Sequence, residues 1–336
     1  MKATLEKLFD QQSLNTQEAF ETLCAITRGE VNDSHIAAFM TVYRMREVTL
    51  KELRGFREAL LSLAMKVDLP SEEAIDLCGT GGDNRNSFNI STLSCFVVAA
   101  AGGRVIKHGN YGVSSVSGSS TVLEQVGYRF TTNNGELERS LDESGVCFLH
   151  APLFHSALKN VGVIRKQLGV RTFFNMMGPL VNPAQPKHRL TGVLSNELLR
   201  KYNYLLQSSN ENYTLVHSED GFDEISLTAP VKVVTRVSED VFDAEELGLP
   251  TCTVEELYGG ATVQDAAELF LEVLRGHGTI AQSNVVAVNA GYALYNLGIT
   301  LDPRAGFFLA LEMLRSGKAN ETFKKFMQIG TAVKAK

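Results

Sequence analysis

The sequence has little of several features that would place a protein in a special class. Its 336 residues include no tryptophan, 8 prolines and 5 cysteines, and 21% of the residues are charged. Such a composition excludes a disordered chain, a collagen-like repeat and a small scaffold held together by disulfides. The length allows one large domain or two smaller ones.

An excess of positive charge is also absent. The chain has 32 Lys and Arg against 38 Asp and Glu, which gives a formal net charge of −6. Because neutralisation of phosphates drives non-specific binding to nucleic acids, this balance argues against that function. A small local basic pocket is still compatible with the acidic net charge.

Cysteine pairs and long apolar runs are missing as well. No two cysteines form a C-x-x-C pair, which favours buried reduced thiols over disulfides or a zinc site. The longest stretch of small apolar residues, 96–101, is far shorter than the ~20 residues that span a bilayer. The first residues lack the apolar core of a signal peptide, so we expect a cytoplasmic protein.

Residues 1–67 have the apolar periodicity of helices. Asn15 precedes Glu18, and Thr49 precedes Glu52, at the spacing of capping boxes. Few side chains in this segment could carry chemistry, so we expect it to have a structural or subunit-contact role.

From about residue 70 onward, short apolar runs alternate with helical periods. This alternation predicts an α/β domain around a mostly parallel sheet. We therefore expect a small helical domain, residues 1–70, and a large α/β domain, residues 71–336. The expected strands are 74–77, 104–106, 146–149, 190–194, 213–217 and 231–237. The expected helices of this domain are 91–101, 119–126, 156–168, 263–274, 280–297 and 306–315.

A glycine-rich loop, Gly79-Thr80-Gly81-Gly82-Asp83, lies between an expected strand and an expected helix. Its glycines permit left-handed conformations, and successive N–H groups of such a loop can surround an anion. Asn89, Ser91 and Thr92 stand at the start of the helix, where unpaired N–H groups also favour anions. The combination favours a phosphate or diphosphate site over a simple tight turn. It matches neither G-x-G-x-x-G nor the P-loop pattern.

A second polar cluster, Lys107-His108-Gly109-Asn110 with the serines of 114–120, follows the strand expected at 104–106. Ligands of open α/β sheets bind beyond the carboxyl ends of strands, so both clusters should face one crevice. Lys107 could neutralise a phosphate there. Taken alone, it could equally be a solvated surface lysine, and His108 a hydrogen-bonded loop residue.

Two further features could complete a site. Asp223 and Glu224 are adjacent carboxylates, which on extended backbone point in opposite directions and suit two separate cations. Hard oxygen ligands of this kind favour Mg²⁺. Arg165 or Arg171 could bind a carboxylate through two N–H groups. Taken singly, these residues could be an acidic turn and ordinary exposed arginines.

In their order and spacing, these clusters resemble the anthranilate phosphoribosyltransferase family. The matching stretches are Gly79–Thr92, Lys107–Ser119, Arg165–Pro183 and Gly221–Leu227. The resemblance implies transfer of a phosphoribosyl group from 5-phosphoribosyl 1-diphosphate to anthranilate, with release of diphosphate, in tryptophan biosynthesis. It also implies an active site in a cleft between the two domains. Part of 160–185 would pack onto the helical domain, and a homodimer would be joined through that domain.

The resemblance also assigns roles to single residues. Those that would bind the phosphoribosyl diphosphate are Gly79, Gly82, Asp83, Ser87, Asn89, Ile90, Ser91, Thr92, Lys107, Ser115 and Ser119. Those that would bind anthranilate are Gly79, His108, Asn110 and Arg165. Those that would serve Mg²⁺, with two ions per subunit, are Ser91, Asp223 and Glu224.

Three positions depart from the family pattern. Tyr111 stands where Arg is common, Thr121 where Asp is common, and Ser87 where Thr is common. Ser87 keeps the hydroxyl, whereas Tyr111 changes the charge expected near the phosphates.

Two other functions stay open on the sequence alone. Pyrimidine nucleoside phosphorylases share a Lys-His-Gly loop, but the acidic pair and the chain length argue against that activity. A non-catalytic relative that binds nucleic acid would be basic and would lack the acidic pair.

Overall fold

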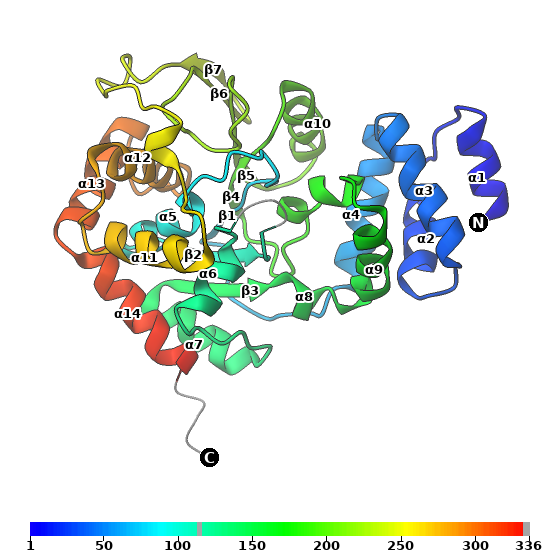
Figure 1. Cartoon of the computed structure of the whole chain (residues 1–336), viewed down its shortest axis with the longest axis horizontal. Helices are drawn as coiled ribbons and strands as arrows, with labels where there is room; N and C mark the ends of the chain where they lie inside the picture. The colour runs from blue at the N-terminus through cyan, green and yellow to red at the C-terminus, as the bar shows by residue number, and fades with distance from the viewer. Residues whose placement is uncertain (113–115, 332–336) are drawn as a thin grey trace. The chain divides into compact units, whose positions relative to one another are not determined.

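The computed structural model describes residues 1–112 and 116–331, which form two compact units (Figure 1). The helical unit consists of Met1–Val67 and Ala151–Pro183. The α/β unit consists of Asp68–His150 and of the chain from Ala184 onward. The helical unit is therefore built from two stretches that are far apart in the sequence.

Helices account for most of the helical unit. Both predicted capping boxes are confirmed. The side chains of Asn15 and Thr49 accept a hydrogen bond from the N–H of the glutamate three residues later, and the carboxylate of that glutamate accepts one from the N–H of the capping residue. Helix α9 packs against α2 and α3. The helices are α1 (Lys2–Phe9), α2 (Thr16–Thr27), α3 (Asp33–Met45), α4 (Leu50–Leu63), α8 (Ala151–Phe154) and α9 (Lys159–Leu168), with 3₁₀ turns Ser156–Leu158, Phe173–Met176 and Gly178–Leu180.

An aromatic cluster holds the two stretches of the helical unit together. Phe39 and Tyr43 from α3 and Phe56 from α4 surround Phe173, with ring centroids 4.7–5.9 Å from that of Phe173. The contacts of Phe39 and Tyr43 with Phe173 are edge-to-face, and that of Phe56 is tilted. Aromatic pairs of this kind add stability beyond the burial of apolar area. The segment around Phe173 thus belongs to the core of this unit.

A seven-stranded sheet forms the centre of the α/β unit, in the order β3-β2-β1-β4-β5-β6-β7. Strands β1 to β5 run parallel, and β6 pairs antiparallel with both β5 and β7, so the predicted mostly parallel sheet is confirmed. The strands are β1 (Ala74–Leu77), β2 (Arg104–Gly109), β3 (Val146–His150), β4 (His188–Gly192), β5 (Asn212–Ser218), β6 (Val231–Thr235) and β7 (Glu239–Phe242).

The chain reverses its direction of travel across the sheet between β1 and β4. Strands β2 and β3 follow on one side of β1, and β5 follows on the far side of β4. In open α/β sheets the loops after the two strands at such a reversal diverge and leave a crevice for ligands. The backbone pairing continues past the strands here, because Cys78 and Thr80 donate N–H bonds to the carbonyls of Leu190 and Gly192.

Helices pack against this sheet and against one another (Figure 1). Helix α5 packs on β1 and β2, helix α12 packs on β4 and β5, and the two helices contact each other. The sequence analysis missed α7, α10 and α14, which are amphipathic, and β7, which has mostly exposed side chains. The helices are α5 (Ile90–Ala100), α6 (Ser119–Gln125), α7 (Asn134–Ser144), α10 (Asn196–Gln207), α11 (Val263–Leu274), α12 (Ile280–Asn296), α13 (Pro303–Arg315) and α14 (Lys318–Thr331).

No helix in the described part of the chain is long and apolar enough to cross a membrane. All five cysteines carry free thiols, and four of them are buried while Cys78 is half-buried.

Candidate active site

The loop between β1 and α5, residues 78–89, is shaped by left-handed backbone. Gly81 and Gly82 have φ angles of 64° and 81°, and Asn84 and Asn86 have φ angles of 59° and 48°. Glycine adopts this region freely, and asparagine adopts it more readily than other residues with a side chain. The predicted glycine-rich turn is confirmed, and two asparagines extend it.

The loop and the first turn of α5 contain unsatisfied polar atoms. Asn89 caps the helix by accepting a hydrogen bond from the N–H of Thr92. The buried atoms Thr80 Oγ1, Asn89 Nδ2 and Thr92 Oγ1 make no hydrogen bond with any described residue. Since buried polar groups normally have partners, these atoms indicate a ligand with acceptor oxygens. The helix N-terminus favours a ligand that is negatively charged.

The acidic pair lies against the same loop. Gly81 N–H donates to Asp223 Oδ2 (2.6 Å), and Ser91 N–H donates to Glu224 Oε1 (3.0 Å). The two residues lie in a bend rather than a strand, so the extended backbone expected for them is absent. Asp223 accepts its hydrogen bond from the loop after β1, and Glu224 accepts its hydrogen bond from the first turn of α5.

Two glycines allow Asp223 to approach this closely. A Cβ atom on Gly192 would lie 1.4 Å from the carbonyl oxygen of Asp223, and one on Gly79 would lie 2.3 Å from its Oδ2. Asn289 of α12 fixes Ile225, the residue that follows the acidic pair. Its side chain accepts from the Ile225 N–H (3.1 Å) and donates to the Ile225 carbonyl (2.9 Å). The sequence analysis did not identify Asn289. The available signal was a polar residue within the apolar run 285–291 of this helix.

Burial makes the acidic pair electrostatically unfavourable in the free protein. It raises the pKa of Asp223 to about 7, with a further contribution from Asp83. Burial, Asp223 and Asp83 together raise the pKa of Glu224 well above its ordinary value. A bound cation would relieve this repulsion, and paired carboxylates are ligands that Mg²⁺ accepts.

Protein side chains alone do not surround a metal ion. No cluster of three or more His, Cys, Asp or Glu side chains suited to a metal exists among residues 1–112 and 116–331. Mg²⁺ commonly binds through one or two carboxylates together with water and substrate phosphates. The acidic pair fits that mode of binding.

Lys107 is buried beside the pair, with 2% of its surface exposed. Its Nζ donates to the Leu77 carbonyl and to Ser91 Oγ (3.2 Å). Although burial lowers the pKa of Lys107, the neighbouring ionisable groups raise it above its ordinary value, Cys95 and Cys78 more than Asp76 and Glu224. The side chain is therefore a buried cation and not a solvated surface lysine.

The residues after β2 meet the start of α6. Ser119 Oγ and the Ser120 N–H both donate to the carbonyl of Asn110 (3.2 and 3.1 Å). Tyr111, which departs from the family pattern, donates its hydroxyl to Glu124 Oε1 (3.4 Å) and so adds no positive charge. His108 is buried within β2, where its N–H donates to Asp76 Oδ1. The predicted residue Ser115 lies outside the described residues.

A small pocket of about 10 Å³ opens between these groups, at the reversal point between β1 and β4. Its volume is enough for about one water molecule. The residues that line it are Leu77, Cys78, Gly79, Ser91, Leu190, Gly192, Val216, Asp223, Glu224 and Asn289.

Two predicted residues differ from the others in their setting. The side chain of Ile90 is fully buried in the core, which leaves only its backbone for a ligand. Arg165 belongs to the helical unit, on α9, where its Nη2 donates to Asn175 Oδ1 (3.3 Å) and its guanidinium lies over the ring of Phe174. Burial lowers the pKa of Arg165.

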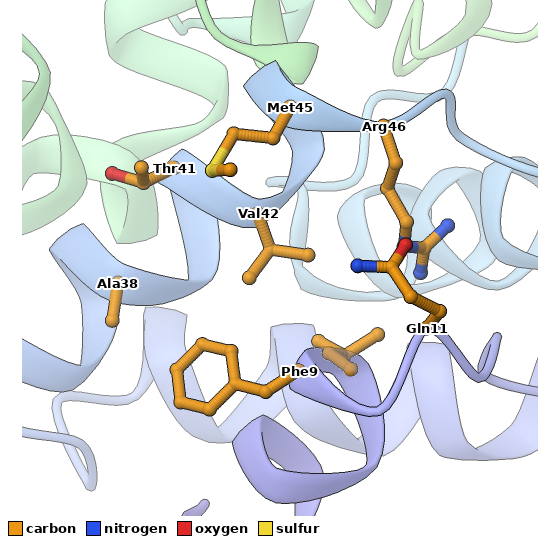
Figure 2. Close-up of a pocket in the computed structure, with 8 residues that line it drawn as sticks. Phe9, Gln11, Ala38, Thr41, Val42, Met45 and Arg46 are labelled. Carbon is orange, nitrogen blue, oxygen red and sulfur yellow. The ribbon is translucent and has the colours of Figure 1, made fainter.

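The helical unit contains a separate pocket of about 400 Å³ between α1 and α3. Figure 2 shows Phe9 of α1 facing Ala38 and Val42 of α3 across it. Its charged side chain, Arg46, is paired with the buried Glu52. No predicted site residue lines this pocket, and its apolar walls offer no group for catalysis.

Two family models match this sequence. Residues 2–64 match the helical bundle domain of the glycosyl transferase family, and residues 71–320 match its a/b domain. An anthranilate phosphoribosyltransferase of Christiangramia forsetii is 50% identical over 98% of this chain and 99% of its own length. The chain belongs to the anthranilate phosphoribosyltransferase family. A further member, from Flavobacterium psychrophilum, is 51% identical over the same shares of the two chains.

Solved structures of the anthranilate phosphoribosyltransferase family share this fold. The enzyme of Thermus thermophilus superposes with a TM-score of 0.90 at 32% identity, covering 97% of this chain and 98% of its own. The enzyme of Saccharomyces cerevisiae in complex with PRPP and Mg has a TM-score of 0.89 at 24% identity, with 99% of each chain covered. The helical domain and the α/β domain with a mostly parallel sheet, expected from the sequence, are confirmed.

Proposed function

We propose that this protein transfers the phosphoribosyl group of 5-phosphoribosyl 1-diphosphate to the amine of anthranilate. The products are N-(5-phosphoribosyl)anthranilate and diphosphate, and the reaction belongs to tryptophan biosynthesis in the cytoplasm. The single observation that carries the proposal is the group of partnerless buried donors at the N-terminus of α5, beside a buried lysine and an acidic pair. Relatives about 50% identical over their full length carry the name of this activity.

The diphosphate end of the substrate would bind where these donors meet. Asn89, Thr92 and Lys107 would contact its oxygens, with the N–H groups of the glycine loop. Negative charge grows on the diphosphate as its bond to the ribose breaks. Fixed donors in a buried site stabilise such charge without having to reorganise. Gly79, Gly82, Asp83, Ser87, Ile90, Ser91, Ser115 and Ser119 would complete the binding of this substrate.

Two Mg²⁺ ions per subunit would be held by Ser91, Asp223 and Glu224. When bound, Mg²⁺ neutralises charge on the diphosphate leaving group. The carboxylates of Asp223 and Glu224 accept hydrogen bonds from different N–H groups, so each has its own backbone support. This arrangement suits two ions better than one chelated ion.

Arg165 would bind the carboxylate of anthranilate, with Gly79, His108 and Asn110 as further contacts. The Arg165 guanidinium is half-buried and hydrogen-bonded to a neutral amide, so it is held in place without a carboxylate partner. The amine of anthranilate is neutral at physiological pH. No strong general base is therefore required, and orientation of the two substrates supplies much of the rate.

We expect Arg165→Ala to raise the KM for anthranilate by about 10–100-fold, because a bidentate charged contact is lost. The KM for phosphoribosyl diphosphate should stay within about twofold of wild type. Steady-state kinetics with each substrate varied in turn measures both constants. Lys166→Ala, at an exposed neighbouring position, is the matched control. Unchanged anthranilate KM and unchanged kcat in Arg165→Ala would exclude the carboxylate contact.

The direct test of the function uses the fluorescence of anthranilate. Emission should fall only when the protein, anthranilate, phosphoribosyl diphosphate and Mg²⁺ are all present. Omission of any one component is the control. Release of free base from thymidine and phosphate, with no loss of anthranilate emission, would instead identify a nucleoside phosphorylase.

The apolar pocket of Figure 2 supports the expected homodimer joined through the helical unit. Phe9 and Met45 at its edge are 57% and 82% exposed, and exposed apolar groups of this kind mark association surfaces. We expect Phe9→Glu with Met45→Glu to yield a monomer in size-exclusion chromatography with light scattering. Leu301→Glu, at a position 95% exposed in the α/β unit, is the control and should leave the dimer intact. A dimeric double variant would contradict this interface.

A further inference from the structure

Asn86 connects the loop after β1 to two other segments of the α/β unit. Its Nδ2 donates to the carbonyl of Gly260 (2.8 Å), and its Oδ1 accepts from the N–H of Val116 (3.3 Å). Its own carbonyl accepts from the N–H of Gly259 (2.7 Å). Both polar atoms of this side chain are thus engaged, each with a different segment.

Neighbouring contacts show how closely these segments approach one another. Ser117 Oγ donates to the carbonyl of Ser87 (2.5 Å), and the Phe88 N–H donates to Leu257. A Cβ atom on Gly259 would lie 2.6 Å from the Ser87 carbonyl, so the backbones pack with no space for a side chain. A small displacement of residue 86 would therefore move both the segment at Val116 and the segment at Gly260.

Two of the three segments that Asn86 joins, its own loop and the segment before α6, carry proposed ligand-binding residues. Ser87 and Asn89 follow it directly in the loop. Val116 lies just before Ser119, the first residue of α6. One side chain thus sets the spacing between the glycine loop with its helix N-terminus and the start of α6.

The backbone at this position also restricts which residues can replace Asn86. Its φ of 48° lies in the left-handed region, which glycine and asparagine adopt at low cost. Asn84 has the same type of backbone (φ 59°), yet its side chain is exposed and makes no hydrogen bond with the described residues. The two positions thus share the backbone requirement and differ in the contacts of the side chain.

We propose that Asn86 is a positioning residue for the phosphoribosyl diphosphate substrate. Its side chain holds the glycine loop and the N-terminus of α6 at the separation at which both contact the same ligand. This inference rests on the proposed function. Asn86 itself need not touch the substrate.

The test compares Asn86→Gly with Asn84→Gly, which both keep a residue suited to left-handed backbone. We expect Asn86→Gly to lower kcat/KM for phosphoribosyl diphosphate by about tenfold or more, because two hydrogen bonds that set loop geometry are lost. The KM for anthranilate should change by less than about twofold. Asn84→Gly should match wild type in both constants.

A second variant separates positioning from simple loss of stability. Asn86→Asp keeps the left-handed preference and the acceptor for Val116, but it places a carboxylate oxygen against the Gly260 carbonyl. Its kcat/KM should therefore fall at least as far as that of Asn86→Gly. Calorimetric titration with diphosphate and Mg²⁺ should show the same order of affinities without turnover. A lowered melting temperature with unchanged kcat/KM and unchanged diphosphate affinity would overturn the positioning role.

The outcomes also distinguish this inference from the proposed function. If wild type transfers the phosphoribosyl group and Asn86→Gly does so equally well, the inference fails and the function stands. If wild type neither binds diphosphate with Mg²⁺ nor consumes anthranilate, both fail.

Discussion

Replacing Asp223 with Asn and Glu224 with Gln is expected to abolish phosphoribosyl transfer and, at the same time, to make the protein more stable. The activity should fall by about 10³-fold or more, because neutral amides hold Mg²⁺ poorly and the charge on the leaving diphosphate would no longer be neutralised. Initial rates of anthranilate consumption at saturating Mg²⁺ measure this effect. Glu245→Gln, at an exposed site, is the control and should keep wild-type rates.

The gain in stability follows from the raised pKa values of the pair. The pKa of Asp223 is 3.8 in its ordinary state and about 7 in the folded protein, because of burial and of Asp83. Between these two values the folded protein binds more protons than the unfolded chain, so the free energy of unfolding falls as the pH rises. The amides carry no charge, and they keep acceptors for the N–H groups of Gly81 and Ser91.

The melting temperature, measured without Mg²⁺, reports this effect. The double variant should melt at least about 2 °C above wild type at about pH 8. The difference should shrink toward about pH 4, where the wild-type carboxylates are also protonated. Added Mg²⁺ should raise the melting temperature of wild type and not that of the variant. A variant that is less stable at every pH would contradict the electrostatic explanation.

Lys107→Met is expected to have the second largest effect. It should lower kcat/KM for phosphoribosyl diphosphate by about 10²–10³-fold, since a buried cation beside the diphosphate is removed. It should also lower the melting temperature, because Asp76 and Glu224 would lose the positive charge that faces them. Kinetics and thermal denaturation measure the two consequences separately.

Two further variants sharpen this prediction. Lys107→Arg keeps the charge but must fit a larger group into a site that is 2% exposed. Its melting temperature should therefore lie above that of Lys107→Met and below that of wild type. Lys232→Met, on β6 of the same sheet, removes a half-exposed lysine paired with Glu239 and should change kcat/KM by less than about twofold. Wild-type kinetics in Lys107→Met would exclude contact with the diphosphate.

Local patterns were enough to predict much of the architecture. The six expected strands are present as β1 to β6, and β1, β3 and β6 are largely apolar runs. Strand β4 lies at His188–Gly192 and not at 190–194, because its sequence HRLTG carries little apolar signal. Strand β7 has no such run, since its residues Glu239–Phe242 are mostly exposed at the end of the sheet. Helix α9 begins at Lys159 and not at residue 156, because a 3₁₀ turn forms its first part.

The identity of most site residues was also readable from the sequence. Gly81, Gly82 and Asn89 have the conformations or caps that their residue types favour, and these are local properties. The backbone conformation of Asp223 and Glu224 was not a local property. These residues form a bend instead of the expected extended segment, and the following residue, Ile225, is hydrogen-bonded to Asn289, 64 residues away in the sequence.

The sequence by itself determined the class of fold, the elements rich in apolar residues and the glycine loop, because periodicity and φ preference act within a few residues. Only the tertiary structure decided that β1 lies beside β4, that Asp223 rests on Gly192, and that Asn86 joins three segments. Each of these is a contact between residues distant in the chain. Such contacts arise from packing and desolvation of the whole unit, which no short stretch of sequence encodes.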